Sequence, residues 1–319
     1  MVEQTEAIRR GSGGQILRSW HIGDVEITRI DEILIPAPPG MVFAGGTPEH
    51  VTRNPWLKPH FVDEDGNLLM SIHGFVVESQ GMRIMVDSCV GNGKRRNLGV
   101  LNMLKTSFYQ DLGAAGFSPE EFDVALCTHL HADHCGWNTR LVDGQWVPTF
   151  RNARYLIGRV EYEHAMQGAL NEHDWEEFHA DTVKPLVDAG LCDLVEADHR
   201  VTDEVRLMET HGHTPGHVSV VIESRGERAV ITGDMIHHPI QLAELDLSSN
   251  FDGDVVRARR TRERFIGDCS GTNTLVLGCH FADPTGGWIV PAGDAWRLEV
   301  DRPKFGAESR ASVRSSSGK

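Results

Sequence analysis

The 319-residue sequence predicts a mixed α/β fold, and three local patterns support that class. Short apolar runs bounded by turn residues predict buried strands. Longer segments place apolar residues at helical spacing or begin with a capping residue, which predicts helices between the strands. Four of the apolar runs lead directly into polar loops rich in His or Asp, so a sheet would present these side chains along one edge.

The N-terminal region is predicted to contain an arm, a strand and a hairpin. Residues 1–18 are expected to form a loose arm before a single domain over residues 19–301. Asp24–Ile33 alternates apolar and polar residues, as a half-buried strand does. The apolar runs Ser71–Glu78 and Arg83–Asp87 are separated by a Gln-Gly turn and indicate a hairpin.

A long irregular segment separates that strand from the hairpin. Residues 36–60 are rich in Pro and Gly, and such a segment inside a domain is either disordered or functional. Its aromatic residues, together with two further ones, are candidates for an apolar rim around a substrate pocket, with core packing as the alternative for each. These aromatic residues are Phe43, Trp56, Phe61 and Trp137.

Helices are predicted at several places. Leucine and phenylalanine recur at helical spacing over residues 97–115, and Ser118-Pro119 begins another helix with Ser as its cap. Residues 138–204 are expected to be a helical insert with helices over 159–170 and 173–189. Asp252 is expected to cap a helix that runs to about Ile266, and the tail 302–319 is expected to be disordered.

The helix after Asp252 carries five arginines, which indicate a solvated, ion-paired face.

The four strands that lead into polar loops form a second group of predicted elements. These strands are Val124–Cys127, Val205–Met208, Val230–Thr232 and Leu275–Leu277, and they lead to His129, His211, Gly233-Asp234 and Gly278-Cys279-His280.

The composition excludes several classes of protein. Hydrophobic residues make up 40% and charged residues 24%, which is typical of a globular chain and not of a disordered or fibrous one. A formal charge of -15 argues against a nucleic-acid partner, and no apolar run is long enough to span a membrane. The N-terminus does not resemble a signal peptide, so a cytoplasmic location with free thiols is expected. Cys135 stands out because it directly follows the motif described next.

The segment His129-Leu130-His131-Ala132-Asp133-His134 has the pattern H-x-H-x-D-H. Alternation along an extended segment would place His129 and His131 on one side, and the following turn would bring Asp133 and His134 towards a second position. Zinc binds imidazole and carboxylate groups readily. The spacing therefore predicts a site for two adjacent metal ions.

The sequence resembles the metallo-β-lactamase superfamily, because further pieces occur in that family's order. Beyond the H-x-H-x-D-H motif these pieces are Thr214-Pro215-Gly216-His217, Thr232-Gly233-Asp234 and Gly278-Cys279-His280. The resemblance implies a four-layer αββα sandwich with two metal ions at one edge. The expected ions are Zn2+, with other divalent metals as alternatives.

The resemblance also implies which residues bind each ion. His129, His131 and His217 would bind the first, Asp133, His134 and His280 the second, and Asp234 would bridge both. His211 and His213 compete with His217 for its role. We favour His217 because the family places its ligand after the Thr-Pro-Gly turn.

The resemblance further implies a hydrolase in which a metal-bridging hydroxide attacks a lactone, an ester or a related bond in a small molecule. Asp133 would orient this hydroxide and transfer a proton. The long gap between His134 and His217, and the run from Gly233 to His238, resemble the methyl parathion hydrolase and acyl-homoserine lactonase branch. Acyl-homoserine lactonases usually carry Tyr at the position of His237 in this chain. His237 would contact the substrate or leaving group, or else support Asp234.

Three alternatives remain at this stage. A phosphotriester or β-lactam hydrolase would use the same ligands. An iron-dependent protein of persulfide or oxygen chemistry is disfavoured, because the diiron branch typically has an acid at the position of His131. The partner is expected to be a small-molecule substrate and neither a nucleic acid nor a membrane, and residues 138–204 could support a homodimer or a lid.

Overall fold

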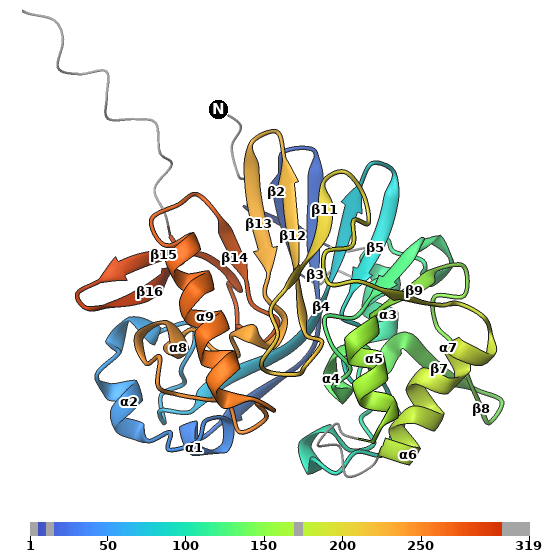
Figure 1. Ribbon diagram of the computed structural model, residues 1–319, viewed down its shortest axis with the longest axis horizontal. Coiled ribbons are helices and arrows are strands. Elements are labelled where there is room, and N and C mark those ends of the chain that lie inside the picture. The colour runs from blue at the N-terminus through green and yellow to red at the C-terminus, as the bar shows by residue number, and fades with distance from the viewer. Residues whose placement is uncertain (1–5, 11–15, 169–174, 302–319) are drawn as a thin grey trace, which may run out of the picture.

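The computed structural model describes residues 6–10, 16–168 and 175–301, and the predicted tail 302–319 lies outside these ranges. Within them the chain forms two large sheets from two successive parts, residues 6–195 and 205–299 (Figure 1). The first sheet has the order β1 (Glu6–Arg10), β2 (Ile16–Ile22), β3 (Val25–Ala37), β4 (Leu68–Ser79), β5 (Met82–Val86), β6 (Val124–Leu126), β9 (Arg154–Gly158) and β10 (Cys192–Val195). The second has the order β11 (Val205–Glu209), β12 (Val218–Ser224), β13 (Glu227–Ile231), β14 (Leu275–Leu277), β15 (Gly286–Ala292) and β16 (Ala295–Glu299). A separate hairpin is formed by β7 (Thr139–Val142) and β8 (Gln145–Pro148).

Helices cover the outer face of each sheet, which gives the predicted four-layer αββα sandwich. The helices α3 (Phe108–Ala114), α5 (Arg159–Met166), α6 (Trp175–Phe178) and α7 (Lys184–Asp188) lie on the side of the first sheet, and α8 (Ile240–Ala243) and α9 (Val255–Cys269) on the side of the second. Alternate residues of one strand face different layers: Val77 lies between the sheets, whereas Val76 packs with Phe108 and Leu112 of α3. Strands buried on both faces explain the near-continuous apolar runs in the sequence.

The four strands that carry polar loops end at the same edge of the sandwich. In the second sheet, β11 and β13 are both antiparallel to β12, and β14 is parallel to β13, so these three strands run in one direction. In the first sheet, β6 lies parallel to β5 and β9. The loops after β6, β11, β13 and β14 can therefore meet.

The N-terminal predictions need two corrections. Residues 1–18 are not all a loose arm, because Glu6–Arg10 forms strand β1, whose backbone pairs with β2. The segment 36–60 is not disordered: it contains α1 (Pro39–Val42), α2 (Pro48–Thr52) and a 3-10 turn at Pro55–Leu57. Phe43, Leu57 and Phe61 anchor it because their side chains are buried in the core.

The predicted helix over 97–115 is confirmed only in its last part, as helix α3, because residues 99–101 form a 3-10 turn instead. Between them, the Asn92 side chain donates to the Thr106 carbonyl oxygen (2.8 Å) and accepts from the Thr106 N–H (2.7 Å). These bonds replace those of a helix. The helix start at Ser118 is confirmed only as one 3-10 turn, Pro119–Glu121.

The segment 138–204 is not a purely helical insert. It also supplies β9 and β10, which extend the first sheet in parallel with β6. The predicted helix over 159–170 is present as α5, and that over 173–189 as α6, a π-helical turn at His179–Val183 and α7, while residues 169–174 lie outside the described ranges.

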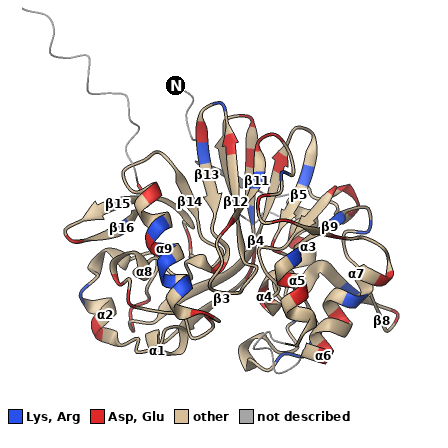
Figure 2. Cartoon of the chain, viewed as in Figure 1, with Lys and Arg blue, Asp and Glu red and all other residues tan. Residues whose placement is uncertain are grey.

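The last long helix, α9, begins two residues later than predicted. Its cap is Asp254, whose side chain accepts from the Arg257 N–H, and not Asp252. Arg259 of this arginine-rich helix pairs with Glu263, as predicted. Figure 2 shows several basic segments along α9. Arg262 is the exception, because it is fully buried.

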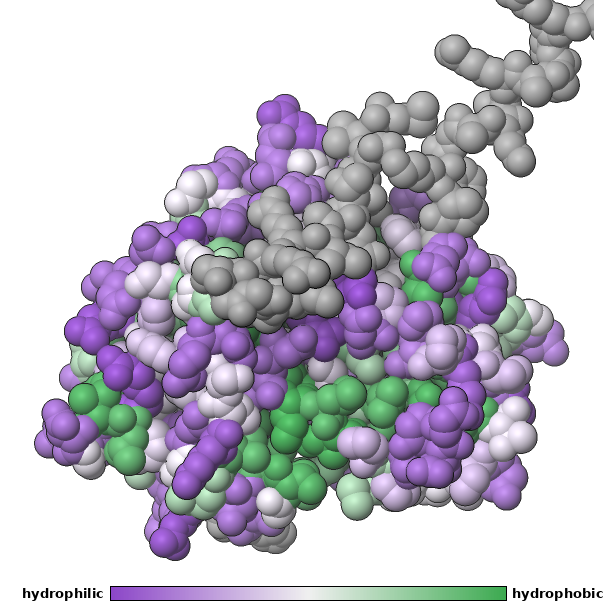
Figure 3. Space-filling model, turned by 180° about the vertical axis from the view of Figure 1, so that it is seen from behind, coloured by the Kyte–Doolittle hydropathy of each residue, from purple (hydrophilic) through white to green (hydrophobic). Residues whose placement is uncertain are grey.

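The surface of the described residues is mixed in character. Seen from behind, the molecule is largely hydrophilic, with a hydrophobic area at the lower centre (Figure 3). None of the helices in the described part of the chain is long and apolar enough to span a membrane.

Candidate metal centre

The H-x-H-x-D-H motif forms a tight turn at the end of β6. His129 lies just beyond the strand, and His131 immediately precedes the short helix α4 (Ala132–Cys135), which carries Asp133 and His134. The helix redirects the second pair of side chains relative to the first pair. The turn therefore presents four ligand-type groups in two directions, as its spacing predicts.

The second sheet supplies three more ligand-type side chains. His213 follows β11, Asp234 lies in the turn Gly233–Met235 after β13, and His280 follows β14. These side chains converge on the motif from the first sheet.

We call His129, His131 and His213 the first group. One ring nitrogen of each lies within 4.8 Å of the others and of an Asp234 carboxylate oxygen. His131 Nδ1 is 2.8 Å from His213 Nε2. Three imidazoles and one carboxylate thus face a common point.

We call Asp133, His134 and His280 the second group, whose ligand atoms also lie within 4.8 Å of one another. The Nε2 atom of His280 is 3.5 Å from Asp133 Oδ2, and that of His134 is 3.8 Å from Asp133 Oδ1. The Asp133 side chain is 20% exposed, whereas His134 and His280 are buried. The second group therefore meets solvent at Asp133.

Asp234 lies between the two groups, as the prediction of a bridging ligand requires. Its Oδ1 atom is 3.1 Å from Nε2 of both His134 and His280. Its Oδ2 atom is 3.4 Å from His213 Nε2 and 3.8 Å from His129 Nε2. Oδ2 is also 3.3 Å from His280 Nε2, so Oδ1 faces the second group and Oδ2 lies between the two groups.

The structure does not place His217 in either group, so our choice of His217 over His213 is not supported. His217 Nε2 accepts a hydrogen bond from the Asp234 N–H (2.9 Å), and Nδ1 therefore donates to Thr210 Oγ1 (2.8 Å). Both ring nitrogens are used. Gly233 permits this packing, because a Cβ atom there would lie 2.6 Å from His217 Nε2. Through this hydrogen bond, His217 stabilises the backbone position of Asp234.

The remaining rival, His211, also lies outside both groups. Its Nδ1 atom accepts a hydrogen bond from Arg257 (2.8 Å). Of the three histidines in this loop, the structure brings only His213 into a group of ligand-type atoms.

Three of the imidazole rings are held in a tautomer that suits metal binding. His213 Nδ1 bonds to Asp252 Oδ1 (3.0 Å), His134 Nδ1 to Asp87 Oδ2 (2.9 Å), and His280 Nδ1 to the Ser71 carbonyl oxygen (2.9 Å). Because each Nδ1 faces an acceptor, it carries the proton and leaves the Nε2 lone pair directed at the centre.

His129 follows the same rule through Thr128. The Thr128 hydroxyl donates to Asp87, so it accepts from His129 Nδ1 (3.1 Å). The Nε2 atoms of His129 and His134 and Oδ1 of Asp234 are buried without a hydrogen-bond partner. Imidazole nitrogens and carboxylate oxygens that converge in this state fit divalent cations such as zinc.

The two groups differ in their electrostatics. Burial lowers the pKa of His131 to about 3 and also holds the pKa of His129 and His213 well below the usual histidine value. Burial acts in the same direction on His134 and His280, but the neighbouring carboxylates outweigh it and raise both pKa values. The second group therefore lies in the more negative part of the site.

His237, predicted as catalytic, lies inside the same cluster. Its Nε2 atom is 3.3 Å from Asp234 Oδ2, and its ring is stacked with that of His280 at a centroid distance of 6.0 Å. The side chain is only 3% exposed, and both ring nitrogens lack a hydrogen-bond partner.

Most of the predicted aromatic rim belongs to the core. Phe43 and Phe61 are buried, and Trp137 stacks on Phe108 at a centroid distance of 5.8 Å. Trp56 is partly buried against the same core cluster as Phe43. Cys135 is also buried, and its Sγ atom contacts the His131 carbonyl oxygen (3.1 Å), so it is not presented for reaction.

Sequence reasoning did not identify Asp87, Asp252 or Ser71 as supports of the ligands. Asp87 had a visible signal, because it ends a predicted strand beside the proposed site. Asp252 and the Ser71 carbonyl oxygen had none, since Asp252 has the sequence pattern of a helix cap and a backbone carbonyl group is common to all residues.

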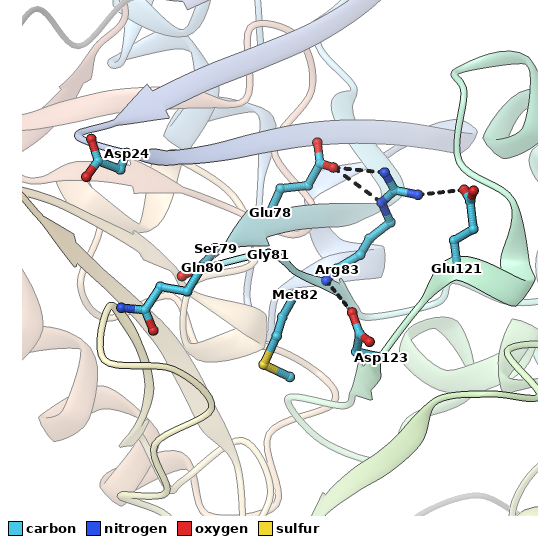
Figure 4. Close-up of a pocket in the computed structure, with 9 residues that line it drawn as sticks. All are labelled: Asp24, Glu78, Ser79, Gln80, Gly81, Met82, Arg83, Glu121 and Asp123. Atoms are coloured by element: carbon cyan, nitrogen blue, oxygen red, sulfur yellow. Dashed lines mark hydrogen bonds and ion pairs between the residues drawn. The ribbon is translucent and has the colours of Figure 1, made fainter.

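A surface depression of about 460 Å3 lies at the opposite end of the strands, around the β4–β5 turn (Figure 4). Arg83 there pairs with Glu78 (3.0 Å) and Glu121 (2.7 Å). Its lining includes no member of the two ligand groups.

The fold and the two ligand groups together define a metal-dependent hydrolase of the αββα type. The model of the metallo-beta-lactamase superfamily matches residues 70–267, and the chain belongs to that superfamily. An N-acyl homoserine lactonase from Bacillus sp is 27% identical over 196 residues, which are 57% of this chain and 68% of that protein. An N-acyl homoserine lactonase from Bacillus cereus is 31% identical over 120 residues, or 38% of this chain and 40% of that protein.

Solved structures show the same fold. The hydrolase AbOPH of the beta lactamase superfamily has a TM-score of 0.73 at 23% identity, over 90% of this chain and 98% of that chain. AidC, a dizinc quorum-quenching lactonase in complex with a homoserine product, has a TM-score of 0.72 at 19% identity, over 90% of this chain and 97% of that chain.

Proposed function

We propose that this chain is a dinuclear zinc hydrolase that opens the ester bond of a lactone, with N-acyl homoserine lactones as the first substrates to test. Relatives named as N-acyl homoserine lactonases support the substrate class. The AidC structure, described as a dizinc lactonase, supports the proposed metal content.

The observation that carries the proposal is the position of the Asp234 carboxylate. Its Oδ1 atom faces His134 and His280 of the second group, and its Oδ2 atom lies between His280 and His213 of the first group. One carboxylate placed in this way suits two adjacent cations better than one.

The chain's own residues divide the work around these ions. Two divalent ions held by these residues would lower the pKa of a bound water molecule to about 7 and would polarise the substrate carbonyl. Asp133, the partly exposed carboxylate, takes a proton from the attacking water and delivers it to the leaving oxygen. His237 would support Asp234 or contact the substrate, because its buried Nε2 atom lies 3.3 Å from Asp234 Oδ2 and makes no hydrogen bond within the described part of the chain.

Two exposed apolar side chains, on segments next to Asp252, favour a substrate with an apolar part. Met41 is 54% exposed and Phe251 is 43% exposed. Asn250 Nδ2 donates to the Met41 carbonyl oxygen, and Asp252 binds His213, so both apolar residues border the support of the first group. An acyl chain suits such surroundings better than a charged nucleotide does.

The test combines metal analysis with a substrate panel on one purified sample. The panel contains N-acyl homoserine lactones of several chain lengths, simple lactones, aryl esters, a phosphotriester and a β-lactam. We expect about two equivalents of zinc, and lactone hydrolysis that is lost on chelation and restored by zinc. His131→Ala should lose activity and keep the fold, whereas His199→Ala, outside the site, should change neither.

Less than one equivalent of metal, or activity indifferent to the chelator, would contradict the proposal. Faster turnover of the phosphotriester or the β-lactam would replace the lactone by that substrate. Iron in the isolated protein with oxygen uptake would indicate the other class of chemistry.

A further inference from the structure

We infer that Glu161 is a positioning residue that sets the distance between the two ligand loops of the first group. This inference rests on the metal centre of the proposed function, but it does not depend on the substrate. Glu161 lies in the first turn of α5, outside both ligand groups, and is only 1% exposed.

Each carboxylate oxygen of Glu161 holds a different loop. Oε1 accepts the Leu130 N–H (3.0 Å), and Leu130 lies between His129 and His131. Oε2 accepts the Gly216 N–H (3.1 Å), in the loop that follows His213. One side chain therefore joins the motif of the first sheet to the histidine loop of the second sheet.

The contact between α5 and this loop leaves no room for adjustment. A Cβ atom on Gly216 would lie 2.2 Å from the Glu161 backbone nitrogen and 2.5 Å from its Cα atom. The loop backbone thus rests directly on the first turn of the helix. The close packing fixes how near the loop can come to α5, and the hydrogen bond from Gly216 to Glu161 holds it there.

A carboxylate is the side chain that this arrangement requires. Two N–H groups from different loops need two acceptors, and a glutamine offers only one acceptor oxygen, while its NH2 group would face an N–H. Burial raises the pKa of the Glu161 carboxyl, which the Leu130 and Gly216 N–H groups partly offset. Retaining an acid in so buried a place costs stability, and the gain is the fixed spacing of the two loops.

The experiment compares Glu161→Gln with Glu163→Gln, which changes an exposed acid on the same helix. Metal-free protein is titrated with Zn2+ against a chromophoric chelator, the absorption spectrum of the Co2+-loaded protein is recorded, and thermal unfolding is followed in parallel. In Glu161→Gln we expect one of the two equivalents to bind about 10–100-fold more weakly, with an altered Co2+ spectrum and a cooperative unfolding transition. Glu163→Gln should behave as the wild type.

Two results would overturn the inference. One is wild-type affinity for both equivalents and an unchanged Co2+ spectrum in Glu161→Gln. The other is loss of cooperative unfolding in Glu161→Gln, which would make Glu161 a residue of the fold in general. A wild type that binds two zinc ions but hydrolyses no lactone would defeat the proposed substrate and leave the inference standing, whereas a wild type without metal affinity would defeat both.

Discussion

The first ligand group and the second are built from similar side chains but are supported in different ways. The first is fully imidazole, and its loops are held by the buried acids Glu161 and Asp252. The second includes the partly exposed Asp133 and rests on the loop after β5, where the Ser88 N–H donates to the His134 carbonyl oxygen (2.6 Å).

This difference separates two tasks within one site. The first group has one carboxylate, shared through Asp234, and its His131 is also partly exposed, so the two groups differ in charge more than in exposure. The second group has Asp133 as well, lies in a more negative environment and meets solvent. Substrate exchange and proton transfer are therefore expected on the side of the second group.

Asp234→Asn tests the element that the two groups share, and we expect the largest effect here. The amide nitrogen of the new side chain cannot bind a cation. One ligand group therefore loses its contact with residue 234, and the other keeps a weaker contact through the amide oxygen. Metal content should fall below two equivalents, and lactone hydrolysis should fall by about 10³-fold or more. Asp268→Asn, at an exposed position of α9, is the matched control for metal analysis and steady-state kinetics.

His213→Ala and His217→Ala sharpen the description of the first group. The alanine at position 213 removes a ligand atom, so we expect about one equivalent of zinc to remain. The alanine at position 217 removes only a support of Asp234, so two equivalents should remain, with activity reduced by about 10–100-fold. Metal analysis decides between them, and loss of zinc from His217→Ala with full occupancy in His213→Ala would restore our sequence-based choice.

The loop after β5, which supports the second group, leads to Lys94, whose side-chain amine is buried. Its Nζ atom donates to Thr139 Oγ1 (2.7 Å) and to the Asp181 carbonyl oxygen (2.6 Å). Burial lowers the pKa of Lys94 from 10.5 to about 7, against the opposing effect of Asp181. Between these pH values the unfolded chain binds more protons than the folded chain, so the free energy of unfolding should rise with pH.

We expect this rise to reach about 1.4 kcal/mol per pH unit for a single lysine and to disappear in Lys94→Met. Denaturant unfolding at several pH values from 7 to 10 measures the slope. Lys105→Met, at an exposed position, should keep the wild-type slope. Equal slopes in wild type and Lys94→Met would show that the buried amine does not titrate in this range.

The sequence predicts burial in this fold better than it predicts secondary structure. Strands with both faces covered leave continuous apolar runs, so β4, β5, β6, β13 and β14 could be recognised. The apolar spacing over 97–115 correctly indicates that Leu101, Phe108 and Leu112 are buried, although Leu101 lies in a turn and not in a helix. Leu98 of the same pattern is 43% exposed. Periodicity reports which residues face the core and not which hydrogen bonds form.

The ligands show the same limit. The H-x-H-x-D-H motif is contiguous, so its four side chains are neighbours in any compact conformation. The choice among His211, His213 and His217 depends on Gly212, whose φ of +141° and contact with Ala258 of α9 orient the loop. Such long-range packing leaves no mark in the local sequence.

The connection between the two sheets, residues 196–204, also divides the ligands. Everything before it supplies only the H-x-H-x-D-H residues, and everything after it supplies His213, Asp234 and His280. A chain cut in this connection would yield two fragments, neither of which could complete either group. Zinc would then act as the reporter of their reassociation, since a full set of ligands exists only when both fragments have come together.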